Sequence, residues 1–446
     1  MFIKAGHWPP HLSIHCWRVA LAWAVLAAPA VMAQTPGVPI DPAGSLTLDD
    51  AVELALAHNP GLAALDAQAD ALDAMPSQAG ALPDPVLSLN AMNLPTDTFN
   101  LDQEPMTQLQ IGVSQSFPFP GKRKLKREAA EYEAQAGDAR SAEQRNALQG
   151  AVRAAWWQVF AFDRSLEIVD QNKALMRDFV KIAETKYSVG QGLQQDVLLA
   201  QLELSRLLDR EARLKGRRRS AQANLNALLD RPPNRAVMIA RTPPNVRLPE
   251  LPAEAVLLDQ AGESRDLLNV HRELLEAADS RLSLAKRDVY PDFRLGAGYG
   301  FRQGNDALRG NRADFFSVML SVNVPLYFGT KQSKAIDQRS HERAQRRYSL
   351  SAVLRSIEAE VTRHLADYDA AREQVLLLDT AIIPQAQQTV ASMLAGYQVN
   401  KVDFLNVVNG QLTLYNAQIN YWEALSQAKR SLAGVAAAVG TETIYE

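Results

Sequence analysis

Two aspartates occupy positions where acidic side chains could act on a cation. Asp196 and Asp403 each follow a short polar turn between two long helical stretches. If several copies surrounded an opening, such carboxylates would form acidic rings, and these concentrate cations. Each aspartate can equally be a capping or first-turn carboxylate that complements the dipole of its own helix. Both interpretations stay open, and the two roles can coexist.

The other side chains with metal or catalytic chemistry are scattered along the chain. Among His58, His271, His341 and His364 no two are spaced i, i+4, and there is no glycine-rich phosphate loop and no Ser/His/Asp constellation. A soft-metal site would need clustered methionines, and these are dispersed too. The sequence therefore predicts no enzyme active site, no bound metal and no cofactor. The residues considered are His58, His271, His341, His364, Met75, Met92, Met106, Met176, Met238, Met319 and Met393.

Composition excludes some classes of partner. Aromatic residues make up 7% of the 446 residues and the formal net charge is −3, so the chain lacks the basic balance typical of nucleic-acid binding. The one cysteine, Cys16, lies ahead of an apolar run and follows His15 rather than a small residue. Lipidation at Cys16 is therefore not expected, and the rest of the chain offers no disulfide.

The first 33 residues are typical of an export signal. Lys4 and Arg18 precede an apolar run over Val19–Val31, and Val31-Met32-Ala33 provides a small-residue cleavage site. The apolar run is too short for a membrane-spanning helix. We expect a signal peptide over residues 1–33, with cleavage near Ala33.

Two very long helices must position the aspartates. Lys122–Ser188 contains no proline, and its apolar residues recur in a heptad pattern that predicts a supercoiled seam. The same pattern appears in a second helix that we expect over Ser333–Gln398. The seam residues are Leu148, Val152, Ala155, Val159, Phe162, Leu166, Val169, Met176, Val180, Ala183 and Tyr187, then Ile357, Val361, Tyr368, Ala371, Val375, Leu378 and Ile382.

The chain repeats itself. Pro83-Asp84 recurs as Pro291-Asp292, 208 residues later, and the tyrosines that end the long helices, Tyr187 and Tyr397, are 210 residues apart. Proline and glycine recur between a strand candidate and a long helix, which predicts strand-to-helix junctions at Pro118, Pro120, Gly121, Pro325 and Gly329. We expect a first repeat over residues 34–230, a proline-rich crossover over 231–252 and a second repeat over 253–446.

Each repeat is expected to open with a shorter helix. In the first, a Thr47 or Asp49 cap precedes an apolar face that runs to about Met75. Its counterpart is expected over Pro252–Asp288. At the other end of the junctions, the basic cluster Lys122–Arg127 begins the first long helix, where it could contact lipid phosphates or form an ordinary solvated face.

Four strand candidates lie between the short and the long helices, at 84–92, 107–117, 293–301 and 315–324. Each has about 9 to 11 residues with one apolar face and one polar or small face, as expected of a tilted strand crossing a bilayer. A soluble sheet with one buried face has the same alternation. The aromatic residues at the strand ends favour the membrane. Four strands cannot close a barrel, so we expect association of three chains into one barrel of 12 strands.

These features resemble the outer membrane efflux protein (TolC) family. The resemblance is carried by the duplicated repeat, the Pro-Asp strand starts, the junction prolines and Tyr187-x-x-Gly190 followed by Asp196-Val197-Leu198. Phe117–Arg123 and Tyr397–Leu405 are similar to the heavy-metal efflux branch, of CzcC or CusC kind. The chain departs from the family at Leu193, where Ser or Thr is usual, at Asn400, where glycine is usual, and in lacking a lipidated cysteine near the expected cleavage site.

The resemblance implies an α+β membrane protein that forms a homotrimer. Its 12-stranded outer-membrane β-barrel would continue as a 12-helix periplasmic α-barrel, with outer-membrane lipid, a periplasmic adaptor and an inner-membrane RND-type pump as partners. The adaptor or pump would contact the helix tips, at Val189, Gly190, Gly192, Val399, Asn400 and Lys401. The aspartates Asp196 and Asp403 would line the periplasmic entrance.

Pro384 distinguishes the two helical hairpins. It interrupts the second long helix, whereas Ala174 occupies the matching position of the first. Because proline removes a hydrogen bond and kinks a helix, we expect the second hairpin to bend more and to move in an iris-like opening.

Three functions remain open from the sequence. The first is an efflux conduit, for heavy-metal cations. The second is a conduit for drugs or for type I secretion. A soluble periplasmic coiled-coil scaffold, from another class, would explain the heptads but not the strands.

Overall fold

The computed structural model describes residues 45–240, 246–306, 310–399 and 401–445. The chain divides after Gly44, and only the unit that begins at Ser45 is described here. The expected signal peptide, its cleavage near Ala33, Cys16 and the tip residue Asn400 lie outside the described residues. The helices are α1 (Leu48–His58), α2 (Pro60–Asp73), α3 (Met75–Gly80), α4 (Lys122–Ser188), α5 (Gln194–Leu228), α6 (Glu254–Ser264), α7 (Asp266–Arg287), α8 (Gln332–Leu377), α9 (Ile383–Gln398) and α10 (Phe404–Val439).

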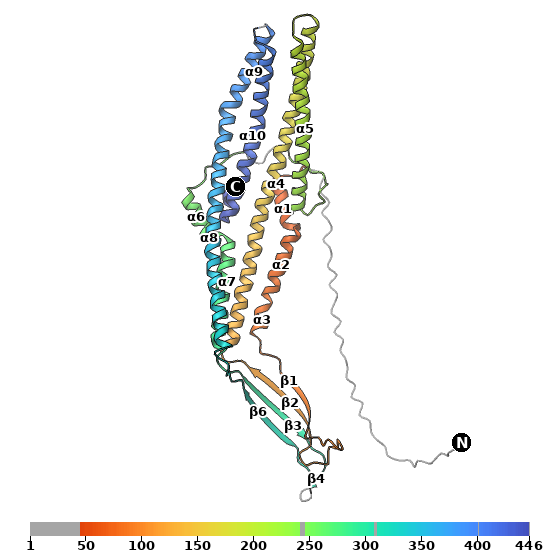
Figure 1. Cartoon of the computed structure of the whole chain (residues 1–446), viewed down its shortest axis with the longest axis vertical. Helices are drawn as coiled ribbons and strands as arrows, with labels where there is room; N and C mark the ends of the chain where they lie inside the picture. The colour runs from red at the N-terminus through yellow and green to blue at the C-terminus, as the bar shows by residue number, and fades with distance from the viewer. Residues whose placement is uncertain (1–44, 241–245, 307–309, 400, 446) are drawn as a thin grey trace, which may run out of the picture. The chain divides into compact units, whose positions relative to one another are not determined.

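Helix α4 has the bounds that its sequence predicts, Lys122–Ser188, and lies beside α5, α7 and α10 (Figure 1). Most of the predicted seam is buried, although Tyr187 at its end is half exposed. The heptad pattern missed a second buried face, on which Trp156, Trp157 and Phe160 contact one another with ring centroids 5.3 to 5.4 Å apart. Helix α4 therefore buries two faces, because it has neighbours on more than one side.

The second long helix is interrupted where proline predicts it. Helix α8 ends at Leu377, a π-helical turn covers Leu378–Ile382, and α9 continues to Gln398. Pro384 has no N–H, and its ring would clash with the carbonyl of Thr380 in a regular helix. The wider turn relieves this clash, and Thr380 Oγ1 donates a hydrogen bond to the Leu376 carbonyl at 2.7 Å.

Both shorter helices are split, which the sequence analysis did not expect. The first breaks at Asn59 because the following proline, Pro60, disfavours helical backbone at the residue before it; Asn59 is extended, and its side chain caps α2 by accepting a hydrogen bond from Leu62 N at 3.1 Å. Thr47 caps α1 as expected. The second region breaks at Arg265, between α6 and α7.

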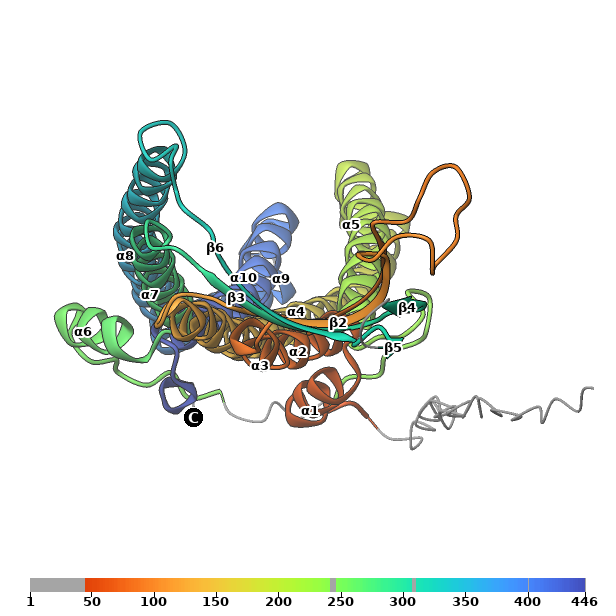
Figure 2. The same cartoon turned by 90° about the horizontal axis from the view of Figure 1, so that it is seen from below.

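The four predicted strands form one antiparallel sheet in the order β1-β2-β3-β6, and the sheet is curved (Figure 2). Two very short strands pair in the loop before β6 and were not expected. The edge strands β1 and β6 have seven and eight residues, fewer than the predicted 9 to 11. The strands are β1 (Val86–Met92), β2 (Gln108–Phe117), β3 (Phe293–Phe301), β4 (Asn305–Asp306), β5 (Gly310–Asn311) and β6 (Phe315–Val322).

Strand register places the predicted apolar residues on one face. Leu89 is opposite Ile111, Ile111 is opposite Tyr299, and Tyr299 is opposite Phe316. Facing residues in an antiparallel sheet share a side, so this apolar row crosses all four strands. In the part of the chain that the structure describes, no helix is both long and apolar enough to cross a bilayer.

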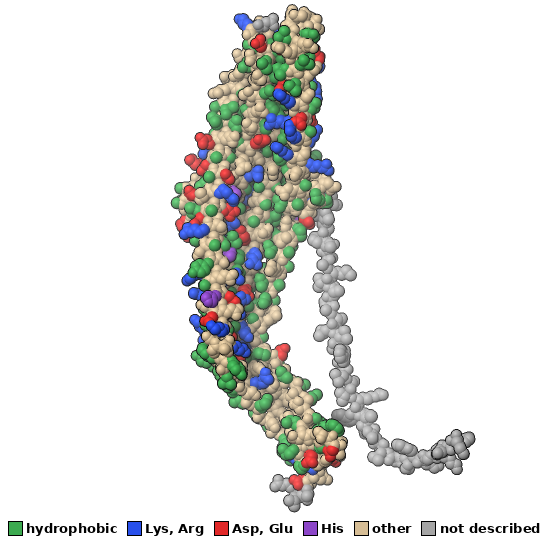
Figure 3. Space-filling view, in the orientation of Figure 1, with side chains coloured by type: hydrophobic (Ala, Val, Ile, Leu, Met, Phe, Trp, Pro, Cys, Tyr) green, Lys and Arg blue, Asp and Glu red, His purple; other side chains and the backbone are tan. Residues whose placement is uncertain are grey.

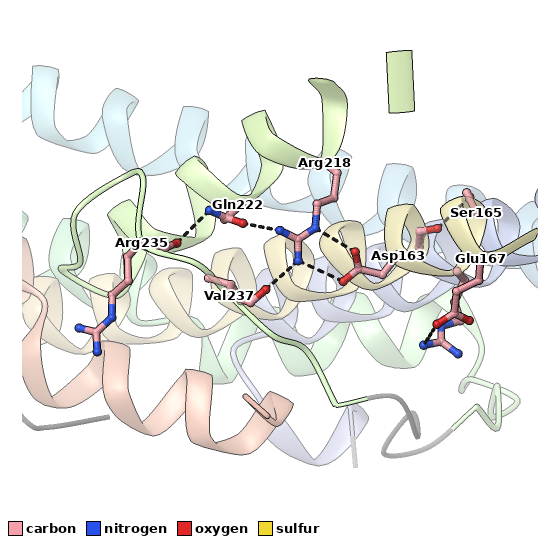
Figure 4. A network of polar contacts seen from close by, with 9 residues as sticks. Asp163, Ser165, Glu167, Arg218, Gln222, Arg235 and Val237 are labelled. Carbon is pink, nitrogen blue, oxygen red and sulfur yellow. Dashed lines mark hydrogen bonds and ion pairs between the residues drawn. The ribbon is translucent and has the colours of Figure 1, made fainter. Parts of the chain in front are cut away.

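The described part of the proline-rich segment is not helical, and side chains of the neighbouring helices hold it in place. Figure 4 shows its anchoring at Arg218 of α5, which donates a 2.9 Å hydrogen bond to Asp163 of α4 and a 2.7 Å hydrogen bond to the Val237 carbonyl. Farther along, Lys429 of α10 donates to the Arg247 carbonyl and Tyr368 of α8 to the Pro249 carbonyl. Side chains from three helices, α5, α8 and α10, thus donate to carbonyl groups of a segment in which proline prevents regular backbone hydrogen bonding.

Candidate functional site

The helix tips have matching turns. After α4 the Gln191 amide donates to the Lys186 carbonyl at 2.8 Å, and after α9 the Lys401 amide donates to the Gly396 carbonyl at 2.9 Å. The two pairs are related by the same 210-residue offset as the tyrosines. Gly190 has φ +75°, a backbone conformation that favours glycine. Of the predicted tip residues, the exposed ones are Val189, Gly190, Val399 and Lys401, and Gly192 is half-buried.

The two predicted gate aspartates sit at helix starts. Asp403 is the N-cap residue of α10 and is exposed, while Asp196 is half-buried in the first turn of α5. Asp403 makes no side-chain capping hydrogen bond to its helix, and the N-cap residue of α5 is Leu193 rather than Asp196. Their carboxylates complement the positive ends of the two helices and remain available to another ligand.

An aromatic cluster joins the two tips of the chain. The Lys186 ammonium lies 4.0 Å from the centre of the Tyr397 ring, and Tyr397 is 5.6 Å from Phe404, which in turn is 6.0 Å from Phe179. Burial, followed by the negative charge of Asp196, raises the pKa of Tyr397. The cluster therefore joins the two hairpins near Asp196, one of the two predicted gate aspartates, and the sequence pattern does not predict this contact.

Buried polar pairs join the long helices away from the tips. The Gln411 amide of α10 donates to Asn172 Oδ1 of α4 at 2.8 Å, and Lys173 of α4 pairs with Glu211 of α5. Hydrogen bonds from Lys173 and Lys215 lower the pKa of Glu211 to about 2. Since these groups lie at positions that an apolar seam would fill, they fix the alignment of the helices.

The junction between β2 and α4 is a buried ionic site. Lys122 is 4% exposed; its Nζ donates to Asp292 Oδ1 and to the Tyr290 carbonyl, both at 2.9 Å, and lies 3.4 Å from Asp288. The Phe119 amide also donates to Asp292 Oδ1, at 2.8 Å. Burial would raise the pKa of Asp292, but the hydrogen bonds from Lys122 and Phe119 outweigh it, and the pKa is below its usual value.

The predicted junction residues surround this site. Gly121 has φ +90°, and the Arg287 guanidinium donates to the Pro120 carbonyl at 2.9 Å. Pro118 ends the strand and aligns the chain toward α4. Lys122 thus has neither of the roles expected for the basic cluster, since it is buried against carboxylates rather than solvated or directed to lipid. The repeated Pro-Asp pair was the signal that could have located it.

The corresponding region of the second repeat has no such ion pair among the residues that the structure describes. Pro325 and Gly329 lie between β6 and α8, as predicted; Pro325 is half-buried, and a Cβ added to Gly329 would meet no atom within 4 Å. Asp84 is the counterpart of Asp292, and Lys331 is the lysine closest in sequence to the counterpart of Lys122. Both residues are exposed. The two halves of the chain therefore differ at their junctions.

The sheet exposes its apolar face. Leu89 is 76%, Phe316 71% and Leu320 67% exposed, and Figure 3 shows few charged side chains over the strands until the loops at their far end. Such a continuous apolar surface marks contact with lipid or protein. Among the described residues, no group of three or more His, Cys, Asp or Glu side chains could hold a metal ion.

Comparison with known proteins agrees with this arrangement. The chain is 24% identical over 412 residues to the cobalt-zinc-cadmium resistance protein CzcC of Cupriavidus metallidurans, covering 91% of this chain and 92% of that one. The crystal structure of the outer membrane protein VceC from Vibrio cholerae matches with a TM-score of 0.72 at 20% identity, over 90% and 97% of the two chains. That of CusC matches with a TM-score of 0.74 at 16% identity, over 89% and 92%.

The sequence profile of one family covers most of the chain. The profile described as "Outer membrane efflux protein" matches residues 51–231 and 257–441. The gap between the two matched regions contains the proline-rich segment that the network around Arg218 anchors. The chain therefore belongs to the outer membrane efflux protein family.

Proposed function

We propose that three copies of this chain form the exit duct of a tripartite efflux system and that the duct conducts heavy-metal cations. Family membership makes the chain an outer-membrane efflux channel with a periplasmic extension, and not an enzyme. The trimer, its partners and the metal substrate are the parts that we propose.

The observation that carries the trimer is the unfinished sheet. Its apolar face is exposed, and the edge strands β1 and β6 each have a partner on one side only among the described residues. Exposed backbone groups cannot face lipid, so a sheet in a bilayer must close. Three chains would supply 12 strands, and the long helical hairpins would continue the wall into the periplasm.

The proposed partners are a periplasmic adaptor and an inner-membrane RND-type pump. Their docking position would be the two helix tips, where Val189, Val399 and Lys401 are exposed and the first turn contains Gly190 and Gly192. Asp196 and Asp403 would form acidic rings at the entrance. Asp403 is exposed, and its carboxylate makes no side-chain capping hydrogen bond to α10.

Two measurements test the channel. Membranes are fractionated, the protein is extracted in mild detergent, and its mass is measured by light scattering; planar-bilayer recordings then give its conductance. We expect detergent-dependent extraction, a trimer and a stable pore. A protein released without detergent would instead support the periplasmic scaffold, and a folded monomer would refute the trimer.

The acidic entrance has its own test. Asp403→Ala should leave trimer assembly intact and reduce the preference for cations over anions, because three carboxylates leave the entrance. Asp306→Ala, in an exposed loop far along the sequence from the tips, is the control. Unchanged cation selectivity in the Asp403 variant would remove this role.

The metal substrate is supported by the similarity to CzcC, whose name states cobalt, zinc and cadmium resistance. A deletion strain should become sensitive to copper, silver, cobalt, zinc or cadmium and be restored by the wild-type chain. Sensitivity confined to dyes and antibiotics would favour the drug-efflux alternative.

A further inference from the structure

The two strand hairpins share one register. Ser88 of β1 is opposite Gly112 of β2, and Gly296 of β3 is opposite Met319 of β6. The second pair is related to the first by the sequence offsets of the repeat: 208 residues, as between the Pro-Asp motifs, and 207 residues, as between Pro118 and Pro325. The repeat therefore holds at the level of individual hydrogen-bonded partners.

The pairing of β2 with β3, which forms the seam between the two strand hairpins, is a template for pairing between subunits. Within the chain β2 pairs with β3, and Ser114 is opposite Gly296. Strand β6 is the repeat counterpart of β2, and β1 is the counterpart of β3. Both counterparts are the free edges of the sheet, so the seam occurs once within a chain and its second version can form only between chains.

We propose that β6 of one subunit pairs with β1 of the next at the register of this template, which sets Ser321 opposite Ser88. The proposal rests on the trimer proposed above and specifies its interface. The partner is a second copy of this chain, because each copy offers one edge of each kind. At this register Leu320 is opposite Leu89 and Val322 is opposite Leu87, so the apolar row continues across the seam. A slip of one residue would reverse the faces.

The proposed pairing of β6 with β1 of the next subunit also brings two opposite charges together. Asp292, which precedes β3, reaches the β2–α4 junction of its own chain and pairs there with Lys122. Its counterpart Asp84, which precedes β1, then reaches the β6–α8 junction of the neighbouring subunit. The cation available there is Lys331, immediately before α8, and both residues are exposed in the single chain. The neighbour thus supplies the missing half of the second junction.

The template also predicts a cross-linking distance. A Cβ atom added to Gly296 would lie 3.3 Å from the Ser114 Cβ, close to the range of about 3.5 to 4.5 Å between the Cβ atoms of a disulfide. Ser321 and Ser88 should approach similarly across the seam. Serine and cysteine are close in size, so the double variant Ser88→Cys/Ser321→Cys should fold.

The experiment uses the full-length protein in outer membranes, oxidised with copper phenanthroline and analysed on denaturing gels without reductant. We expect covalent dimers and trimers from Ser88→Cys/Ser321→Cys. The slipped pair Ser88→Cys/Met319→Cys keeps the same face but separates the residues by two positions, about 7 Å between Cβ atoms, and should stay largely unlinked. Each single-cysteine variant controls for links through Cys16 or between like edges.

The outcomes separate the register from the trimer. If light scattering gives a trimer but the slipped pair links better than the in-register pair, or neither links, the register is wrong and the proposed channel stands. Dimers from Ser88→Cys alone, beyond those of the wild type, would mean that β1 pairs with β1 and would also overturn the register. A folded monomer would overturn both proposals.

The charge pair is tested by reversal. Asp84→Lys should lower the temperature at which the trimer dissociates on native gels by several degrees, and adding Lys331→Asp should restore much of the loss. If Asp84→Lys has no effect, or if the second change lowers the temperature further, these two residues do not pair.

Discussion

Replacing Asp292 with alanine tests whether the β2–α4 junction depends on a buried ion pair. The change removes the acceptor of two hydrogen bonds, from Lys122 Nζ at 2.9 Å and from the Phe119 amide at 2.8 Å. Lys122 would remain almost fully buried, with the Tyr290 carbonyl and the more distant Asp288 as its remaining partners.

The expected loss in the free energy of unfolding follows from the burial of the ion pair. Removing one partner of a fully buried ion pair costs about 3 to 5 kcal/mol, because a charge is left without compensation. Here the Asp292 side chain is 39% exposed, and solvent screens the pair. We therefore expect Asp292→Ala to lower the free energy of unfolding by about 2 kcal/mol.

Two further variants make this measurement specific. Asp288→Ala is the matched control: its carboxylate is 3.4 Å from Lys122 and 52% exposed, so its loss should cost less than about 1 kcal/mol. In Lys122→Met/Asp292→Ala the buried charge is absent as well, and the double variant should be more stable than the sum of the single effects predicts.

The assay is equilibrium urea unfolding in detergent, followed by far-ultraviolet circular dichroism at one fixed protein concentration, because association contributes to stability. A value for Asp292→Ala within about 0.5 kcal/mol of wild type would refute the argument. So would an equal cost for Asp288→Ala, since distance and exposure would then not matter.

Three other perturbations follow from the geometry. Glu211 has a folded pKa of about 2 against an ordinary value of 4.5, so its contribution is complete above about pH 5 and is lost as the pH falls toward 2; Glu211→Gln should flatten the acid side of the pH–stability curve, and an unchanged curve would contradict this. Gly121→Ala should destabilise by about 1 to 2 kcal/mol, because φ is +90° there, whereas Gly329→Ala, where an added Cβ meets no atom within 4 Å, should be neutral by the same urea assay. Pro384→Ala restores the missing N–H and should remove the π-helical turn and lower the open probability of single channels; unaltered gating would argue against a moving second hairpin.

Local pattern was enough to predict much of this fold. The uninterrupted run without proline determined both ends of α4, and alternating side chains located the four strands, because both periods follow directly from backbone geometry. Gly121, Pro325 and Pro384 were found for the same reason, since the backbone preferences of glycine and proline are local. The position of the tips followed from the helices that they join.

Tertiary structure determined which side chains are buried and which are paired, and the helix and strand periods do not predict either. Trp156 and Phe160 lie off the heptad seam and are buried only because α4 has neighbours on several sides. Lys122 looked like part of a surface cluster until the chain brought Asp292, 170 residues away, to its ammonium group. Burial and ion pairing depend on which segments meet in space, and a period along one segment carries no information about the segment that will face it.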